Sequence, residues 1–230
     1  MLNLQICSPY TPCPYKCPFC IVDNSKQEQF VNLFALDEHL YFEKLYKQVK
    51  THQNIILTGN TEPTLFPDWL EKTIITLGFS KNKIELQTKN YNLPLEKFYQ
   101  PFDFFHRINT LAYSITKLSE LYFCKDFKRI DENNRLVILL LNDFLHITAE
   151  EMYELVKEYN QVTFKVLQKN KDTRINEYIE KNKIKDISPF YKIADFLNKK
   201  GISTRIDLDC QNATNRYDIF RIDGNIYHEW

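Results

Sequence analysis

Residues 2–20 read LNLQICSPYTPCPYKCPFC, and they hold the two features on which the predicted fold depends. Apolar and polar side chains alternate over residues 2–7, which predicts a short β-strand. The loop that follows is rich in proline, so a regular helix cannot form before its last cysteine. Within this loop the cysteines Cys13, Cys17 and Cys20 stand at spacings of four and three. The chain therefore places three thiols directly after its first predicted strand.

Strand and helix patterns alternate along the rest of the chain. Further strands are predicted at residues 54–58, 83–88, 109–115, 135–141 and 162–167. Helices are predicted at residues 37–51, 67–77, 148–159 and 189–200, whereas the charged and weakly periodic residues 169–186 are expected to form an exposed excursion. This alternation predicts an α/β fold with a parallel sheet, either doubly wound or curled into a full or partial barrel.

The last thirty residues have a different pattern. A strand is predicted at residues 203–208, and apolar segments at 219–222 and 225–227 flank Asp223-Gly224, which is a strong hairpin signal. We therefore predict an α/β core over residues 1–200 and, over residues 201–230, a C-terminal strand and hairpin packed on that core.

Composition limits the class of protein. The 230 residues are 14% aromatic, which suits one domain with a core that needs no disulfides. Thirty basic residues balance thirty acidic ones, so overall charge favours neither nucleic acid nor a membrane surface. No signal peptide and no apolar run of roughly 18 residues is present, so we predict a cytoplasmic protein that does not bind membranes. In that reducing compartment, clustered cysteines indicate metal ligands or catalytic groups before disulfides.

Three thiolates from one loop can serve several kinds of metal site. They can hold three irons of a cubane cluster and leave the fourth iron open for a ligand. A structural zinc site would need a fourth ligand such as Cys7, because the sequence offers no second cysteine pair. An electron-carrier cluster would need Cys7, Cys124 or Cys210 as its fourth ligand. The five histidines show no ligand spacing and are expected in the core or at the surface.

The segment Cys13-Pro-Tyr-Lys-Cys17-Pro-Phe-Cys20 resembles the CxxxCxxC signature of the radical S-adenosylmethionine (radical SAM) superfamily, including the aromatic Phe19 before the last cysteine. A second resemblance follows the second predicted strand, where the family carries a Gly-Gly-Glu-Pro segment that binds the amino group of the methionine moiety. Here Gly59, Glu62 and Pro63 occupy that place, but one glycine is replaced and two residues separate Gly59 from Glu62.

The residue types in this second segment suit a ligand site. Gly59 would allow a ligand close to the backbone, Glu62 offers an acceptor for an ammonium group, and Pro63 stiffens the turn. The alternative is an ordinary strand-to-helix turn with a solvated glutamate.

Weaker similarities lie at the ends of later predicted strands. Thr88, Ser114 and Asn142 fall where family members place polar side chains toward the cofactor. Each of the three also suits an ordinary strand-end cap. All the candidate residues fall at the carboxyl ends of predicted strands, which is where barrel enzymes carry their sites.

The resemblance implies a partial (β/α)6 TIM-like barrel with one [4Fe-4S] cluster on the catalytic cysteines Cys13, Cys17 and Cys20. It implies reductive cleavage of S-adenosylmethionine to a 5′-deoxyadenosyl radical, and a low-potential electron donor such as flavodoxin or ferredoxin. The substrate is unidentified: the short chain favours a nucleotide-like molecule or small metabolite, and a peptide, protein or RNA remains an alternative. A non-catalytic cysteine-metal module, holding zinc or an iron–sulfur centre, is the alternative from a different class.

Overall fold

The computed structural model describes residues 3–9, 11, 13–20, 37–59, 61–78, 81–91, 107–125, 133–167, 173–208 and 217–228. The chain divides into two compact units, and the second is inserted between two parts of the first. The first unit contains residues 1–111 and 213–230, and the second contains residues 112–212. In both units parallel strands alternate with helices, so the predicted α/β class is confirmed.

The first unit contains five strands in the order β3-β2-β1-β8-β9. Their bounds are β1 (Asn3–Ser8), β2 (Asn54–Gly59), β3 (Lys83–Thr88), β8 (Tyr217–Phe220) and β9 (Ile226–Tyr227). Strand β1 pairs in parallel with both β2 and β8, and β9 returns antiparallel to β8. The predicted C-terminal hairpin is therefore present, and its first strand extends the sheet beside β1.

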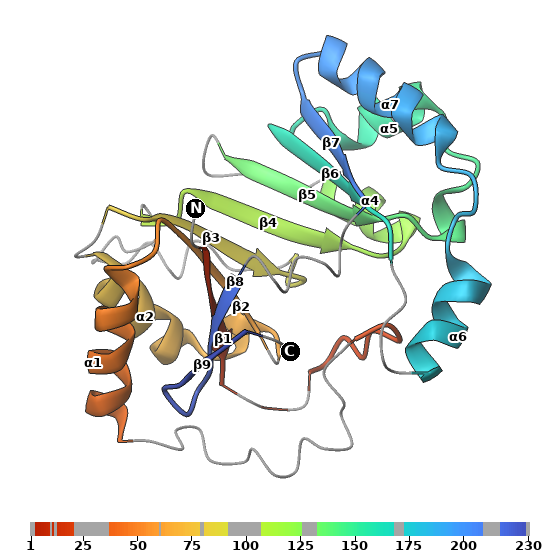
Figure 1. Ribbon diagram of the computed structural model, residues 1–230. Helices are drawn as coiled ribbons and strands as arrows, with labels where there is room; N and C mark the ends of the chain where they lie inside the picture. Colours follow the sequence, from red (N-terminus) through yellow and green to blue (C-terminus); the bar gives the residue numbers. More distant parts are fainter. Residues whose placement is uncertain are drawn as a thin grey trace. The chain divides into compact units, whose positions relative to one another are not determined.

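Two helices cover the strands of the first unit, α1 (Glu38–Val49) and α2 (Pro67–Gly78), as Figure 1 shows. Helix α1 begins where predicted, because the carboxylate of Asp37 accepts a hydrogen bond from the backbone N–H of Leu40 at 3.2 Å. Its buried face packs with α2 and the strands in one apolar cluster. Between β2 and α2 lies the short 3-10 helix η2 (Pro63–Leu65).

The second unit contains strands in the order β4-β5-β6-β7. Their bounds are β4 (Thr110–Ile115), β5 (Asn134–Leu139), β6 (Gln161–Lys165) and β7 (Ser203–Asp207). The helices are α4 (Leu118–Lys125), η4 (Asn142–Phe144), α5 (Ala149–Val156), α6 (Thr173–Asn182) and α7 (Ser188–Lys199). Strand β6 pairs in parallel with both β5 and β7.

One expectation for the second unit is wrong. Residues 169–186 were expected to form an exposed excursion, but they contain helix α6, which is partly buried. Its side chains Ile175 and Ile179 are four residues apart and both are buried, so a narrow apolar face anchors an otherwise charged helix. The division of the chain at residue 200 stays a prediction. No helix in the described ranges is both long and apolar enough to cross a bilayer.

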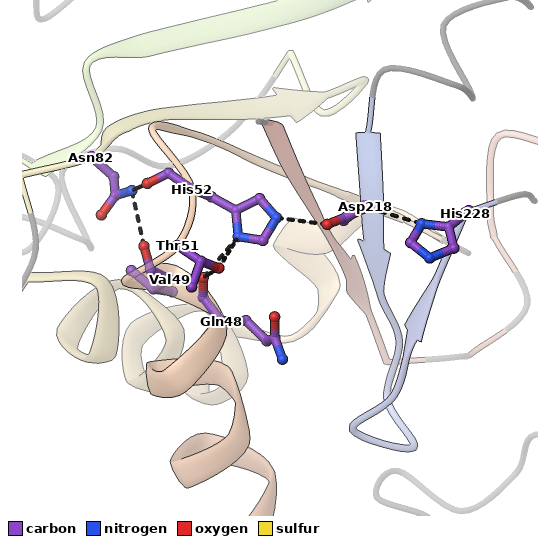
Figure 2. A network of polar contacts seen from close by, with 7 residues as sticks. All are labelled: Gln48, Val49, Thr51, His52, Asn82, Asp218 and His228. Carbon is purple, nitrogen blue, oxygen red and sulfur yellow. Dashed lines mark hydrogen bonds and ion pairs between the residues drawn. The ribbon is translucent and has the colours of Figure 1, made fainter. Parts of the chain in front are cut away.

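A polar network ties β8 to the start of β2 at the amino ends of these strands. Figure 2 shows His52 and His228 directed at opposite oxygens of Asp218, each at 3.0 Å. The other ring nitrogen of His52, Nδ1, lies 2.7 Å from the carbonyl oxygen of Gln48 and 3.0 Å from the hydroxyl of Thr51. The side chain of His52 is 2% exposed, whereas that of His228 is 77% exposed. The two histidines therefore share one carboxylate in very different surroundings.

Replacing Asp218 by alanine is expected to lower the free energy of unfolding by about 2 kcal/mol, because Nε2 of the buried His52 loses its acceptor. The matched control is His228→Ala, which removes the exposed partner of the same carboxylate and should cost about 0.5 kcal/mol or less. Urea denaturation of both variants measures the difference. Equal losses of unfolding free energy in the two variants would show that the buried His52 does not depend on Asp218 more than the exposed His228 does.

Candidate functional site

Three of the predicted motifs lie at one edge of the first unit. Strand β1 ends at Ser8 and leads into the cysteine loop, β2 ends at Gly59, and β3 ends at Thr88. Ser8 and Gly59 are opposite each other in the parallel register. The segment that contains Glu62 follows β2 directly. The carboxyl ends of these parallel strands thus bring the motifs to the same side of the sheet.

Gly59 is required by the contact between β1 and β2. A Cβ atom at this position would lie 2.4 Å from the backbone nitrogen and 2.5 Å from the hydroxyl of Ser8, and 3.2 Å from the carbonyl carbon of Cys7. From the sequence, this glycine was expected to allow close approach of a ligand. The structure instead shows close approach of the neighbouring strand, whereas contact with a ligand stays a prediction.

The segment after Gly59 is held by a hydrogen bond from Ser8 and by the short helix η2. Ser8 donates a hydrogen bond from its hydroxyl to the carbonyl of Thr61 at 3.3 Å. Glu62 caps η2, and Pro63 occupies the first turn of that helix, where its missing N–H costs nothing. Pro63 is buried at the start of η2, which lies in the turn that it was expected to stiffen. These contacts fix the segment against the end of β1.

The carboxylate of Glu62 is buried at 5% exposure and accepts hydrogen bonds on both oxygens. Its Oε1 accepts from the backbone N–H of Thr64 at 3.2 Å, from the Thr64 hydroxyl at 2.9 Å and from the Thr88 hydroxyl at 2.6 Å. Its Oε2 accepts from the backbone N–H of Lys89 at 2.8 Å. The glutamate is therefore not solvated, in contrast to the alternative expectation, and its contact with a ligand stays a prediction.

Every donor to Glu62 is electrically neutral. Within the described part of the chain, Glu62 forms no ion pair with a lysine, arginine or histidine. A buried carboxylate without a cationic partner is costly, because neutral donors replace only part of the hydration that it loses. The arrangement is thus suited to a cationic ligand at the carboxyl edge of the sheet.

Two further residues complete this network, and sequence reasoning missed both. Asn90 donates from its backbone N–H to the Thr88 hydroxyl at 2.9 Å and from its side-chain amide to the Thr64 hydroxyl at 3.1 Å. The Thr64 side chain in turn contacts Glu62. The sequence offered one local signal for the contact between Thr88 and Asn90. A threonine hydroxyl commonly accepts a hydrogen bond from the backbone N–H two residues later.

Thr61 adds an unused polar atom beside Glu62. Its side chain is 7% exposed, and its hydroxyl has no hydrogen-bond partner among the described residues. An unpaired buried hydroxyl costs about 1 to 3 kcal/mol, so such atoms in folded proteins often indicate a bound water or ligand. Thr61 is one of the two residues between Gly59 and Glu62, and the sequence did not indicate that it contacts a ligand.

The cysteine loop offers three thiols that are not in disulfides. Cys13, Cys17 and Cys20 are each partly exposed, and the backbone N–H of Cys20 donates to the carbonyl of Cys17 at 3.0 Å to form a tight turn. Lys16 precedes Cys17 with a φ of +43°, in the left-handed region. Across the described ranges, no three His, Cys, Asp or Glu side chains are gathered in a metal-binding group, so the three thiols are close in sequence without converging on one point.

The other cysteines differ in environment. Cys7 is fully buried, and this burial raises the pKa of its thiol to about 12, although the positive charge of Arg221 acts in the opposite direction. Cys124 is also buried, at 2% exposure. Cys210 lies outside the described residues. A thiol must lose its proton to bind a metal, so the accessible Cys13, Cys17 and Cys20 suit a thiolate-bound cluster and Cys7 does not.

The remaining residues that were predicted to contact the cofactor do not belong to the hydrogen-bond network around Glu62. Phe19 is partly buried within the cysteine loop. Ser114 and Asn142 belong to the second unit, where Ser114 is the penultimate residue of β4 and Asn142 begins η4 after β5. The exposed Asn142 side chain donates to the carbonyl of Lys181 at 3.1 Å. This bond gives Asn142 a structural role at the end of α6, and its contact with a cofactor stays a prediction.

Solved structures share this arrangement of strands and helices. The chain matches anSMEcpe with bound AdoMet at a TM-score of 0.61 and 15% identity, over 99% of this chain and 74% of that one. A histidine-tagged form of anSMEcpe with bound AdoMet matches at a TM-score of 0.58 and 15% identity, over 98% and 71%. SuiB of Streptococcus suis, bound to the precursor peptide SuiA, matches at 0.58 and 15%, over 98% of this chain and 58% of SuiB.

These neighbours are radical SAM enzymes. The fold is the radical SAM fold. The predicted resemblance and the predicted α/β barrel class are thus confirmed at the level of fold, with the antiparallel β8–β9 hairpin at the C-terminus. No family model matches the sequence, and no curated protein matches it. In this radical SAM fold, the cysteine loop follows β1 and the Glu62 segment follows β2, at the same edge of the sheet.

Proposed function

We propose that this protein is a radical SAM enzyme that binds one [4Fe-4S] cluster through Cys13, Cys17 and Cys20. The observation that carries the proposal is the buried carboxylate of Glu62, whose donors among the described residues are all neutral and which lies at the sheet edge from which the cysteine loop emerges. The amino group of S-adenosylmethionine is a cation of the kind that such a carboxylate would bind. The unpaired Thr61 hydroxyl beside it gives the ligand a second polar contact.

When bound, the cluster supplies the electron for reductive cleavage of S-adenosylmethionine to a 5′-deoxyadenosyl radical. The protein's own residues bind and orient the reactant. Glu62 accepts the ammonium group, and the hydroxyls of Thr64 and Thr88 keep its carboxylate in place. Gly59 lets β1 and β2 meet, so the cysteine loop and the Glu62 segment start from adjacent points.

The substrate is proposed to be a nucleotide-like molecule or another small metabolite, and a low-potential donor such as flavodoxin or ferredoxin is proposed to reduce the cluster. A second candidate is modification of a peptide or protein. It is favoured by one observation, the bound precursor peptide of the structural neighbour SuiB. A location in the cytoplasm also stays a proposal.

Anaerobic purification followed by iron and sulfide analysis tests the function. We expect about four irons and four sulfides per chain, and production of 5′-deoxyadenosine from S-adenosylmethionine after reduction with dithionite. Zinc in place of iron, or a fully loaded cluster that leaves S-adenosylmethionine intact, would instead support the non-catalytic cysteine-metal module. Incubation with candidate metabolites and peptides would then separate the two substrate classes by the mass change of the product.

A further inference from the structure

We propose that Asn90 is a positioning residue of the S-adenosylmethionine site. Through Thr64 and Thr88 it directs two hydroxyl protons at Oε1 of Glu62 and thereby leaves Oε2 to accept the ammonium group of the ligand. This inference rests on the proposed function and assigns roles to residues of this chain within it.

The directions of the hydrogen bonds follow from the donors that Asn90 supplies. Its backbone N–H and its side-chain NH2 can only donate, so the hydroxyls of Thr88 and Thr64 act toward Asn90 as acceptors. Each hydroxyl has one proton, and that proton is then free to point at Oε1 of Glu62. If the Asn90 amide had the opposite orientation, its carbonyl oxygen would face the Thr64 hydroxyl. This oxygen would then compete with Glu62 for the proton of that hydroxyl.

The two oxygens of Glu62 are consequently unequal. Among the described residues, Oε1 receives three donors, the two hydroxyls and the backbone N–H of Thr64, whereas Oε2 receives one, the backbone N–H of Lys89. A carboxylate has about four lone-pair positions, two on each oxygen. Oε1 is therefore saturated and Oε2 keeps an acceptor position for a cation.

The same contacts hold the ends of two strands in register. Glu62 and Thr64 follow β2, and Thr88 and Asn90 lie at the end of β3 and just after it. A change at Asn90 is thus transmitted to Glu62 without any contact between Asn90 and the ligand. We therefore expect a change at Asn90 to lower the binding affinity only for ligands that have an ammonium group.

Isothermal titration calorimetry on the oxidised, cluster-loaded enzyme tests this without turnover. The two probes are S-adenosylmethionine and 5′-methylthioadenosine, which lacks the amino-acid portion. We expect Thr64→Val and Thr88→Val each to weaken binding of S-adenosylmethionine by about tenfold, which is the effect of one charge-assisted hydrogen bond. Asn90→Ala removes only the neutral side-chain bond to Thr64 and should weaken binding by about fivefold. The affinity for 5′-methylthioadenosine should stay within about twofold of wild type, and Thr64→Ser and Thr88→Ser should restore tight binding.

A matched control is Asn82→Ala. The side chain of Asn82 also donates to backbone carbonyls, including that of Val49 at 3.2 Å, but it precedes β3 at the opposite edge of the sheet. This variant should lose stability and keep its affinity for S-adenosylmethionine. Thermal unfolding of all variants shows which of them fold.

Two failures are distinguishable. Wild-type protein that binds no S-adenosylmethionine would overturn the proposed function, and this inference with it. Wild-type binding that Asn90→Ala and Thr88→Val leave unchanged would overturn only the positioning role. Equal losses for both probes would show a merely structural effect and would also overturn that role.

Discussion

Replacing Cys17 by alanine is expected to abolish cleavage of S-adenosylmethionine, and Cys13→Ala and Cys20→Ala are expected to do the same. Loss of an outer-shell partner at a metal site commonly costs 10- to 100-fold, so loss of a direct ligand should cost more than about 100-fold. The thiols are partly exposed and come from one short loop, so no neighbouring side chain of the described loop can replace the missing ligand. Iron content and 5′-deoxyadenosine production measure the effect.

The controls for this experiment come from the buried cysteines. Cys7→Ala and Cys124→Ala remove thiols that lie in the core, and Cys7 keeps its proton at neutral pH because burial raises its pKa to about 12. Both variants should retain about four irons per chain and the cleavage reaction. Full iron loading of Cys17→Ala, or loss of iron in Cys7→Ala, would contradict the assignment of the ligands.

Replacing Gly59 by alanine is expected to lower the free energy of unfolding by about 3 kcal/mol. The added methyl group would lie 2.4 Å from the backbone nitrogen of Ser8, and backbone in a paired strand cannot move aside as a flexible side chain can. The ends of β1 and β2 would have to separate. Because the cysteine loop and the Glu62 segment both start there, we also expect weaker cluster binding.

The matched control is Gly78→Ala at the end of α2. A Cβ atom at Gly78 would meet no heavy atom within 4 Å, so the substitution should be neutral or stabilise the protein by up to about 1 kcal/mol. Urea denaturation of the two variants compares them directly. Equal stability of Gly59→Ala and Gly78→Ala would contradict this prediction, because it would show that β1 and β2 can accommodate the added methyl group without cost.

The features that the sequence predicted well are those that depend on near neighbours along the chain. The strand at residues 83–88 has the predicted bounds, because its alternation is regular. The helix predicted from residue 148 begins there, because Thr148 and Glu151 form a capping box in which each side chain bonds the other residue's backbone. Helix α6 was missed because its apolar face consists of little more than Ile175 and Ile179 among charged residues.

The details of the site could not be predicted, since they join residues that only the sheet brings together. Glu62 and Thr88 are 26 residues apart, and their contact depends on β2 and β3 being neighbours in parallel. The motif identified Glu62 as an acceptor but gave no sign of its burial or of Asn90. His52 and Asp218 are 166 residues apart, so the network at the amino ends of the strands had no local signal at all.

The position of β8 has a consequence for the order of folding. Strand β1 carries the cysteine loop, and its second neighbour, β8, begins only at Tyr217. During synthesis β1 must therefore remain an edge strand until nearly all of the intervening chain has been made, with its free backbone groups open to pairing with other chains. Pairing over such a distance also forms late in folding. The strand that leads into the cysteine loop is thus among the last in the first unit to be enclosed on both sides.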